Sequence, residues 1–268
     1  MKAKTKQARW LSENPDKAWG EKFFLIYSPI WMAMMGLSVV LKLPETLNNA
    51  GMLVMGAVTA LPLVLYPLFF HREKGQKWYE TYWFKANLFI FILGFFQNYF
   101  LTHYFFDVLG MVYLYPNVTT HLEAALVGVS RQTVPFIMYF YTQCFYVTYH
   151  ATAIVALRRV STSRMGRFKL AKPIMFLLAA VFWAFMETFI MSKVSGFSFW
   201  YQDVGRMLKF GTLIYAYCFI VSFPFYFALD EKADKKWSVG KVTLCAFAVN
   251  AVTLLLFDVT THFIGSIA

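Results

Sequence analysis

The chain has little charge and almost no cysteine. Asp, Glu, Lys and Arg make up 15% of its 268 residues, whereas soluble domains carry about a quarter. Its three cysteines, Cys144, Cys218 and Cys245, lie in apolar stretches without the paired spacing of a disulfide framework or a metal site. We therefore expect buried free thiols, and we exclude a disulfide-stapled domain.

Motifs of soluble enzymes are also missing. The sequence has no phosphate-binding glycine loop, no HEXXH and no CxxC pair. A retinal-type receptor needs a lysine deep in its last apolar run, but Lys241 stands only at the entrance of that run. There is no repeat or low-complexity linker. Residues 1–268 are therefore interpreted as a single domain.

Long apolar runs dominate what is present, since 59% of the residues are hydrophobic. A helix needs about 20 apolar residues to cross a bilayer. Seven candidate runs cover residues 23–41, 50–70, 86–107, 133–157, 172–192, 208–229 and 242–264. They predict an all-α fold, a polytopic membrane helical bundle of about seven transmembrane helices.

The basic residues are distributed unevenly along the chain. With seven crossings and the N-terminus inside, only Lys42, Arg131, Lys193, Arg206 and Lys209 of the 25 lysines and arginines fall outside. This asymmetry is typical of membrane proteins. The net charge of +11 therefore indicates contact with anionic membrane lipids rather than nucleic acid.

The N-terminal residues 1–21 are predicted to form a basic arm at the membrane interface. Asn14 and Pro15 favour a helix start, with Asn as the cap and Pro at the first helical position. In the outer loop after the third run, Leu122, Ala125, Leu126 and Val129 recur at helical spacing. This spacing predicts a short interfacial helix.

Polar side chains inside the apolar runs are the candidates for function, because such groups are costly in a membrane. Counting about 1.5 Å per helical residue places a set of them in one layer, in the outer half of the bundle. His150 lies lower. The layer contains Asn98, Thr102, His103, Tyr139, Thr142, Gln143, Glu187, Tyr215, Tyr217 and Asp258.

Glu187 stands out in this layer because its neighbours in the sequence, FLLAAVFWAFMETFIM, are almost all apolar. Charge is costly to bury among apolar side chains, so we expect this carboxyl to carry a proton that it can donate. Structural roles remain open for the others. Asn98, Thr102 and Gln143 are equally suited to bonds between helices, and the tyrosines to packing.

Ordered blocks of sequence resemble a known family over nearly the whole chain. They are NPDKAWGEKFFLIYSPIW, YWFKANL, NYFLTHYFFDVLG, the Tyr149-His150 pair with LRR at 157–159, METFIMS and IYAYCFIVSFPFYFALDEK. These blocks resemble the cycloeucalenol cycloisomerases, a family of cyclopropyl sterol isomerases. Asn98, His103, His150, Glu187 and Asp258 match the family pattern, whereas Asp107, Gln143 and His262 depart from it.

The resemblance implies that the chain opens the 9β,19-cyclopropane ring of cycloeucalenol to give obtusifoliol. An acid must protonate the cyclopropane methylene, which leaves a cation at C9, and a base must remove the C8 proton. The implied partners are the sterol and membrane lipids, with no metal, nucleotide or other cofactor. The implied location is the endoplasmic reticulum of a eukaryote or the inner membrane of a bacterium.

Within this reaction, the residues of the layer receive expected roles. Glu187 is the expected acid, with His103 as its partner and Asp258 orienting that histidine. Trp183, Tyr104 and Tyr215 are expected to stabilise the cation through their ring faces. Asn98, Gln143 or Tyr146 is expected to bind the sterol hydroxyl, and Thr102 and His150 complete the predicted binding residues.

Two other functions remain open. The first is a sterol isomerase of the emopamil-binding type, which moves the 8,9 double bond with similar acid and base groups. The second is a sterol sensor or carrier that binds without reaction, and such a protein needs no buried acid beside its ligand.

Overall fold

The computed structural model describes residues 8–71, 76–124, 130, 132–193 and 198–266, and it confirms the predicted helical fold. The long helices are α1 (Pro15–Val40), α5 (Tyr82–Phe100), α6 (Ile137–Ser161), α7 (Ala171–Lys193), α9 (Thr212–Ala228) and α10 (Val239–Ile264), and α3 (Asn49–Ala60) and α4 (Pro62–Phe70) form a bent pair. Short elements are α2 (Leu43–Thr46), α8 (Val204–Arg206), the 3₁₀ turns η1 (Trp78–Glu80) and η3 (Arg164–Arg167), the π-helical turns η2 (Tyr104–Val108) and η4 (Met207–Gly211), and the strands β1 (Met111–Tyr113) and β2 (Phe199–Tyr201).

Within the described ranges, four helices are long and apolar enough to cross a membrane: α1, α7, the segment 204–228 and α10. The bent pair α3–α4, with 43° between its halves, is a fifth candidate. Large apolar side chains point outward from these helices, among them Val40, Phe69 and Leu244. The chain is therefore treated as a membrane protein, while the number seven and the orientation of the N-terminus stay predictions.

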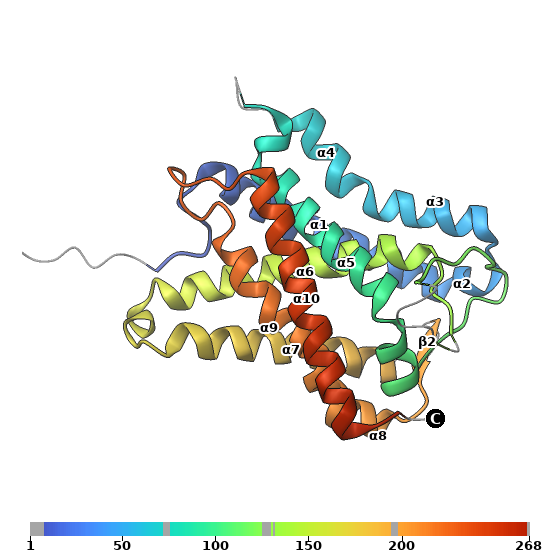
Figure 1. Ribbon diagram of the computed structural model, residues 1–268. Helices are drawn as coiled ribbons and strands as arrows, with labels where there is room; N and C mark the ends of the chain where they lie inside the picture. Colours follow the sequence, from blue (N-terminus) through green and yellow to red (C-terminus); the bar gives the residue numbers. More distant parts are fainter. Residues whose placement is uncertain (1–7, 72–75, 125–129, 131, 194–197, 267–268) are drawn as a thin grey trace, which may run out of the picture.

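Helices α5 and α6 form the interior of the bundle. Helix α6 packs against α1, α3, α5, α7 and α9, and α10 lies across α5 and α9 (Figure 1). Most side chains of α6 are buried. Since other helices cover most of the surface of α5 and α6, these two tolerate more polar residues than the outer helices do.

The start of α1 agrees with the prediction from Asn14 and Pro15. The side chain of Asn14 accepts a hydrogen bond from the Asp16 N–H, and Pro15 is the first helical residue. By contrast, the predicted helix around Leu122 is wrong at that residue. The Leu122 N–H donates to the carbonyl of Val134 in an extended pairing, beside a bridge between His121 and Pro135. Ala125, Leu126 and Val129 lie outside the described residues.

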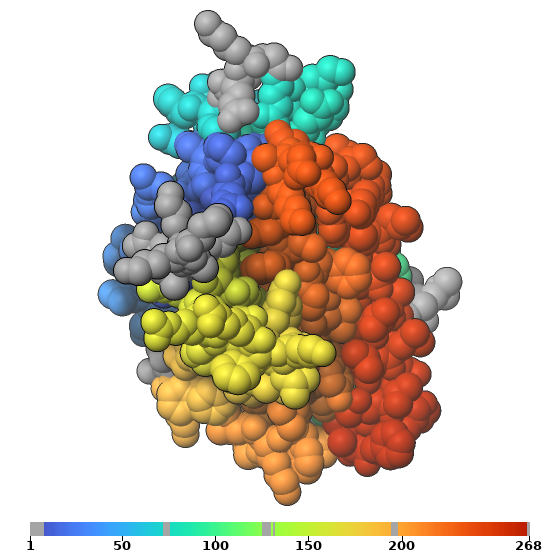
Figure 2. Space-filling view, turned by 90° about the vertical axis from the view of Figure 1, so that its left-hand side faces the viewer, coloured from blue at the N-terminus to red at the C-terminus, as the bar shows by residue number. Residues whose placement is uncertain are grey.

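A buried ion-pair cluster joins distant segments at one end of the bundle. Arg158 at the end of α6 lies 2.6 Å from Glu21 of α1 and 2.7 Å from Glu231, which follows α9. Lys17 lies 3.0 Å from Glu231. Figure 2 faces this end and shows the start of α1 beside the loop after α9. Lys17 and Glu21 of the predicted arm are thus part of the folded core, and the contact of the arm with headgroups stays a prediction.

Glu231 lies in the loop after α9, outside the apolar helices. Burial alone would raise the pKa of its carboxyl, but the hydrogen bonds from Arg158 and the charge of Lys17 lower the pKa below its usual value. Glu231 therefore stays ionised in the folded protein.

The opposite end of the bundle is covered by a small antiparallel pair of strands. Met111, Val112 and Tyr113 of β1 face Tyr201, Trp200 and Phe199 of β2, respectively. The π-helical turns η2 and η4 lie next to these strands in the chain. Such turns occur frequently at functional sites.

Candidate functional site

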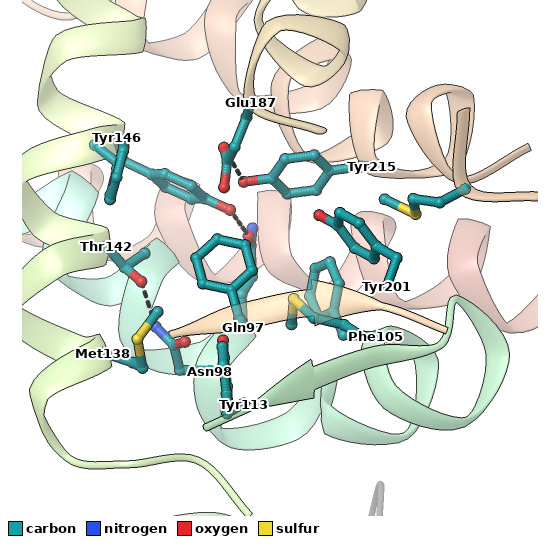
Figure 3. Close-up of a pocket in the computed structure, with 14 residues that line it drawn as sticks. Gln97, Asn98, Phe105, Tyr113, Met138, Thr142, Tyr146, Glu187, Tyr201 and Tyr215 are labelled. Atoms are coloured by element: carbon teal, nitrogen blue, oxygen red, sulfur yellow. Dashed lines mark hydrogen bonds between the residues drawn. The ribbon is translucent and has the colours of Figure 1, made fainter. Parts of the chain in front are cut away.

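A cavity lies between the strand pair and the halves of α5, α6, α7 and α9 that are next to it (Figure 3). Its volume is about 70 Å³, so the side chains of its wall lie close together in this structure. Its wall is mostly aromatic and sulfur-containing, with a few polar groups. The lining residues are Gln97, Asn98, Phe105, Met111, Tyr113, Met138, Thr142, Phe145, Tyr146, Glu187, Phe199, Tyr201, Met207 and Tyr215.

Glu187 provides the carboxyl group in this lining. The hydroxyl of Tyr215 in α9 donates a 2.6 Å hydrogen bond to Oε2 of Glu187 in α7 (Figure 3). The hydroxyl of Tyr149 also lies within interaction range of this carboxyl. Because α7 and α9 pack along each other, the acid and its phenol are positioned by two adjacent helices.

Two polar pairs form the α5–α6 side of the cavity. The hydroxyl of Tyr146 donates to Oε1 of Gln97 at 2.5 Å, and Nδ2 of Asn98 donates to the hydroxyl of Thr142 at 2.8 Å (Figure 3). Gly94, one turn before Asn98, gives these helices room, since an added Cβ would lie 2.9 Å from a methyl carbon of Thr142.

The strands supply two further phenols at the end of the cavity, Tyr113 from β1 and Tyr201 from β2. Burial raises the pKa of both hydroxyls, and the nearby Glu187 carboxyl adds to the effect. Both tyrosines therefore remain protonated hydrogen-bond donors.

The structure brings Asn98, Tyr146, Glu187 and Tyr215 together as the sequence predicted. It does not place His103 and Asp258 with them. Nδ1 of His103 lies 3.0 Å from Asp107, one turn along the chain. Asp258 accepts a hydrogen bond from Tyr104 at 3.0 Å and is largely exposed. Asp258 was expected to pair with His103. In the part of the chain that the structure describes, His103 instead contacts Asp107, and Asp258 contacts Tyr104.

His150 is buried in the core between α6 and α9 rather than at the cavity. Its Nδ1 lies 2.7 Å from the carbonyl of Tyr146, which can only accept, so Nδ1 carries a hydrogen. Its Nε2 lies 2.7 Å from the hydroxyl of Ser222. These contacts are those of a structural histidine.

The other predicted binding residues also lie outside the cavity lining. Gln143 donates to Asn87 of α5 at 2.9 Å. Trp183 stacks on Tyr149, with ring centroids 4.6 Å apart. Thr102 is buried just after the end of α5.

Reasoning from the sequence missed three polar lining residues, Gln97, Tyr113 and Tyr201. Gln97 is next to Asn98 in the run 86–107, the apolar run with the largest number of polar residues. That position in the sequence could have identified Gln97 as a candidate. Tyr113 and Tyr201 come from connecting segments where helical periodicity carries no information. Only the strand pairing brings them to the cavity.

A protonated carboxyl surrounded by phenols and aromatic faces can donate a proton to an apolar ligand and stabilise the resulting cation. Within the described ranges, His, Cys, Asp and Glu side chains form no group of three or more that could bind a metal ion. The carboxyl and phenol groups of the cavity are suited to acid–base chemistry on a hydrophobic molecule.

Comparison with known proteins supplies one informative relative. The chain is 32% identical over 274 aligned positions to the cycloeucalenol cycloisomerase of Arabidopsis thaliana, and the match covers 100% of this chain and 93% of that protein. No family model matches the chain, and no solved structure gives a significant match.

Proposed function

The chain belongs to the cycloeucalenol cycloisomerase family, and on that premise we propose that it opens the 9β,19-cyclopropane ring of a membrane sterol to give the 8-ene. The observation that carries the proposal is the Glu187 carboxyl, which lines an aromatic cavity and accepts a hydrogen bond from Tyr215. A sterol sensor or carrier has no need of an acid at this place.

The proposed reaction begins with the protonated Glu187. Its proton bonds to C19 as the C9–C19 bond breaks, and the electron pair of that bond forms the new C19–H bond. C9 becomes cationic. Ring faces that line the cavity, such as Phe105 and Phe145, stabilise this charge. The hydrogen bond from Tyr215 stabilises the carboxylate that remains.

The second step removes the C8 proton, and the electrons of the C8–H bond form the C8=C9 double bond. C19 and C8 are both attached to C9, so one carboxyl group positioned over C9 can serve both steps. We therefore assign the base role to the Glu187 carboxylate formed in the first step. This return of the proton leaves the acid ready for the next sterol without a net proton exchange.

The binding roles follow from the polar pairs on the α5–α6 side. We propose that Asn98 with Thr142, or Gln97 with Tyr146, binds the sterol hydroxyl, since these are the polar groups of the lining across from Glu187. The membrane that houses the protein is proposed to be the endoplasmic reticulum of a eukaryote or the inner membrane of a bacterium.

The decisive experiment expresses the chain in a sterol-free host, supplies cycloeucalenol and identifies the sterols by mass spectrometry. We expect obtusifoliol from the wild-type protein. Glu187→Gln keeps an oxygen for Tyr215 but removes the transferable proton, so turnover should fall at least about 100-fold. Exposed Glu45 provides the matched control, and Glu45→Gln should act normally.

The outcomes separate the competing functions. Bound but unreacted cycloeucalenol with folded wild-type protein would favour a sensor or carrier. Turnover of an 8-ene sterol but not of cycloeucalenol would favour a double-bond isomerase. Near-normal activity of Glu187→Gln would remove Glu187 from the mechanism.

A further inference from the structure

A second concave surface lies on the far side of the α5–α6 pair from the cavity. It is a groove where α3 bends into α4, with α5 and α6 as its other walls, and its volume is about 420 Å³. Figure 1 shows the bent pair beside these two helices. The walls are almost entirely apolar and rich in phenylalanine, including Phe84, Phe91, Phe95, Phe136 and Phe140. A groove of this size is comparable to ligand sites for small molecules.

Gln143 and Asn87 are the amide residues in the lining of this groove. Nδ2 of Asn87 donates to the carbonyls of Leu63 at 3.1 Å and Trp83 at 2.9 Å. Its Oδ1 is therefore the acceptor that receives Nε2 of Gln143 at 2.9 Å. The reverse orientation of either amide would place two acceptors against each other, so the network fixes both side chains.

This orientation leaves Oε1 of Gln143 without a hydrogen-bond partner among the described residues, although the atom is buried. The whole side chain is only 8% exposed. A buried acceptor without a donor is destabilising. Water is scarce beside lipid tails, and Gln143 lines the groove, so a donor on a molecule bound in the groove would satisfy this atom.

We propose that the groove is a second lipid site, in which the rigid apolar body of a sterol packs against the phenylalanines and its hydroxyl donates to Oε1 of Gln143. Ester carbonyls and acyl chains of phospholipids have no donor to offer this atom. A sterol combines a flat hydrocarbon skeleton with a single hydroxyl donor. The site is separate from the cavity, because Thr142 lines the cavity while its neighbour Gln143 lines the groove.

The test uses the full-length protein in nanodiscs of sterol-free phosphatidylcholine. The probes are a 3β-hydroxysterol with a diazirine on its side chain and the matching 3-keto sterol, which has no donor. Cross-linked peptides are identified by mass spectrometry, and apparent affinities follow from the dose dependence. We expect groove peptides of α5 and α6 to be labelled, with the hydroxysterol bound roughly three- to tenfold more tightly, the effect of one hydrogen bond.

Three variants complete the test. Gln143→Met should abolish the preference for the hydroxysterol. Leu88→Trp should fill the groove and abolish labelling by both probes, without touching the amide network. Leu178→Trp, on the exposed face of α7, should change neither. Equal affinities of the two probes in the wild type, labelling confined to peptides around Tyr113 and Tyr201, or unchanged labelling of Leu88→Trp would each overturn the proposal.

Discussion

At the scale of single residues, the chemistry of the cavity depends on how phenols surround one carboxyl. Tyr215 donates to Glu187 directly, and Tyr149 lies within range of it. A hydrogen bond to the charged form of an acid favours that form. Tyr215 should therefore assist the moment at which Glu187 gives up its proton, more than it assists sterol binding.

Removing the Tyr215 hydroxyl should consequently lower kcat. We expect Tyr215→Phe to reduce the rate of cycloeucalenol conversion roughly ten- to a hundredfold, because a hydrogen bond to a charged group is lost. Tyr217→Phe is the matched control on the same helix, since its hydroxyl meets Thr260 at 3.4 Å outside the cavity lining. Equal rates for both variants in the sterol assay would refute this role.

At the scale of elements, close approach of helices depends on residues without side chains. Gly20 of α1 faces the ring of Tyr82 at the start of α5, and an added Cβ would lie 2.6 and 3.0 Å from two ring carbons. Tyr82 is completely buried, so the ring has little room to move away. The contact between α1 and α5 thus depends on glycine at this position.

A pair of alanine substitutions within α1 tests this contact. Gly20→Ala should lower the free energy of unfolding by about 1–3 kcal/mol through overpacking. Gly36→Ala meets no atom within 4 Å and should instead stabilise the helix by about 0.5–1 kcal/mol. Thermal unfolding in detergent micelles measures both. A loss of the same size at Gly36 would indicate that overpacking is not the cause.

At the scale of the whole molecule, the ion-pair cluster connects parts of the chain that are far apart in sequence. Arg158 bridges Glu21 and Glu231. The side chains of Arg158 and Glu21 are almost entirely buried. Breaking a buried pair leaves a charge without compensation. The cluster therefore contributes to the cohesion of α1, α6 and the loop after α9.

Arg158→Met should destabilise the protein by about 3–5 kcal/mol, because it leaves Glu21 buried without its partner. Arg167→Met changes an exposed arginine in η3 and should alter stability little. Chemical denaturation monitored by tryptophan fluorescence distinguishes the two. Comparable losses would mean that net charge, not the bridge, determines the result.

The same cluster predicts a dependence of stability on pH. Because the folded protein lowers the pKa of Glu231 below its usual value of 4.5, its contribution is fully present above about pH 4.5. The contribution is lost as the pH falls through the folded pKa. The difference in Tm between wild type and Glu231→Gln should accordingly shrink on acidification below pH 4.5. A constant difference from pH 7 to pH 3.5 would contradict this linkage.

The sequence by itself determined the helical class of the protein and predicted that several of its polar groups lie at one level. Apolar runs of membrane length predicted the helices, and the rise of a helix per residue placed Asn98, Thr142, Glu187 and Tyr215 at one level. The structure unites these four in one cavity. Helix formation and the position of a residue along its helix depend on local geometry, so they can be predicted from the sequence around each residue.

Only the tertiary structure decided which groups at that level meet. Gln143 lies one residue from Thr142 but turns to Asn87 on the other side of α5, and His103 pairs with Asp107 instead of Asp258. Tyr113 and Tyr201 reach the cavity through a strand pair between segments about 90 residues apart. Depth is a property of one helix, whereas the direction of a side chain depends on how each helix rotates to pack against its neighbours.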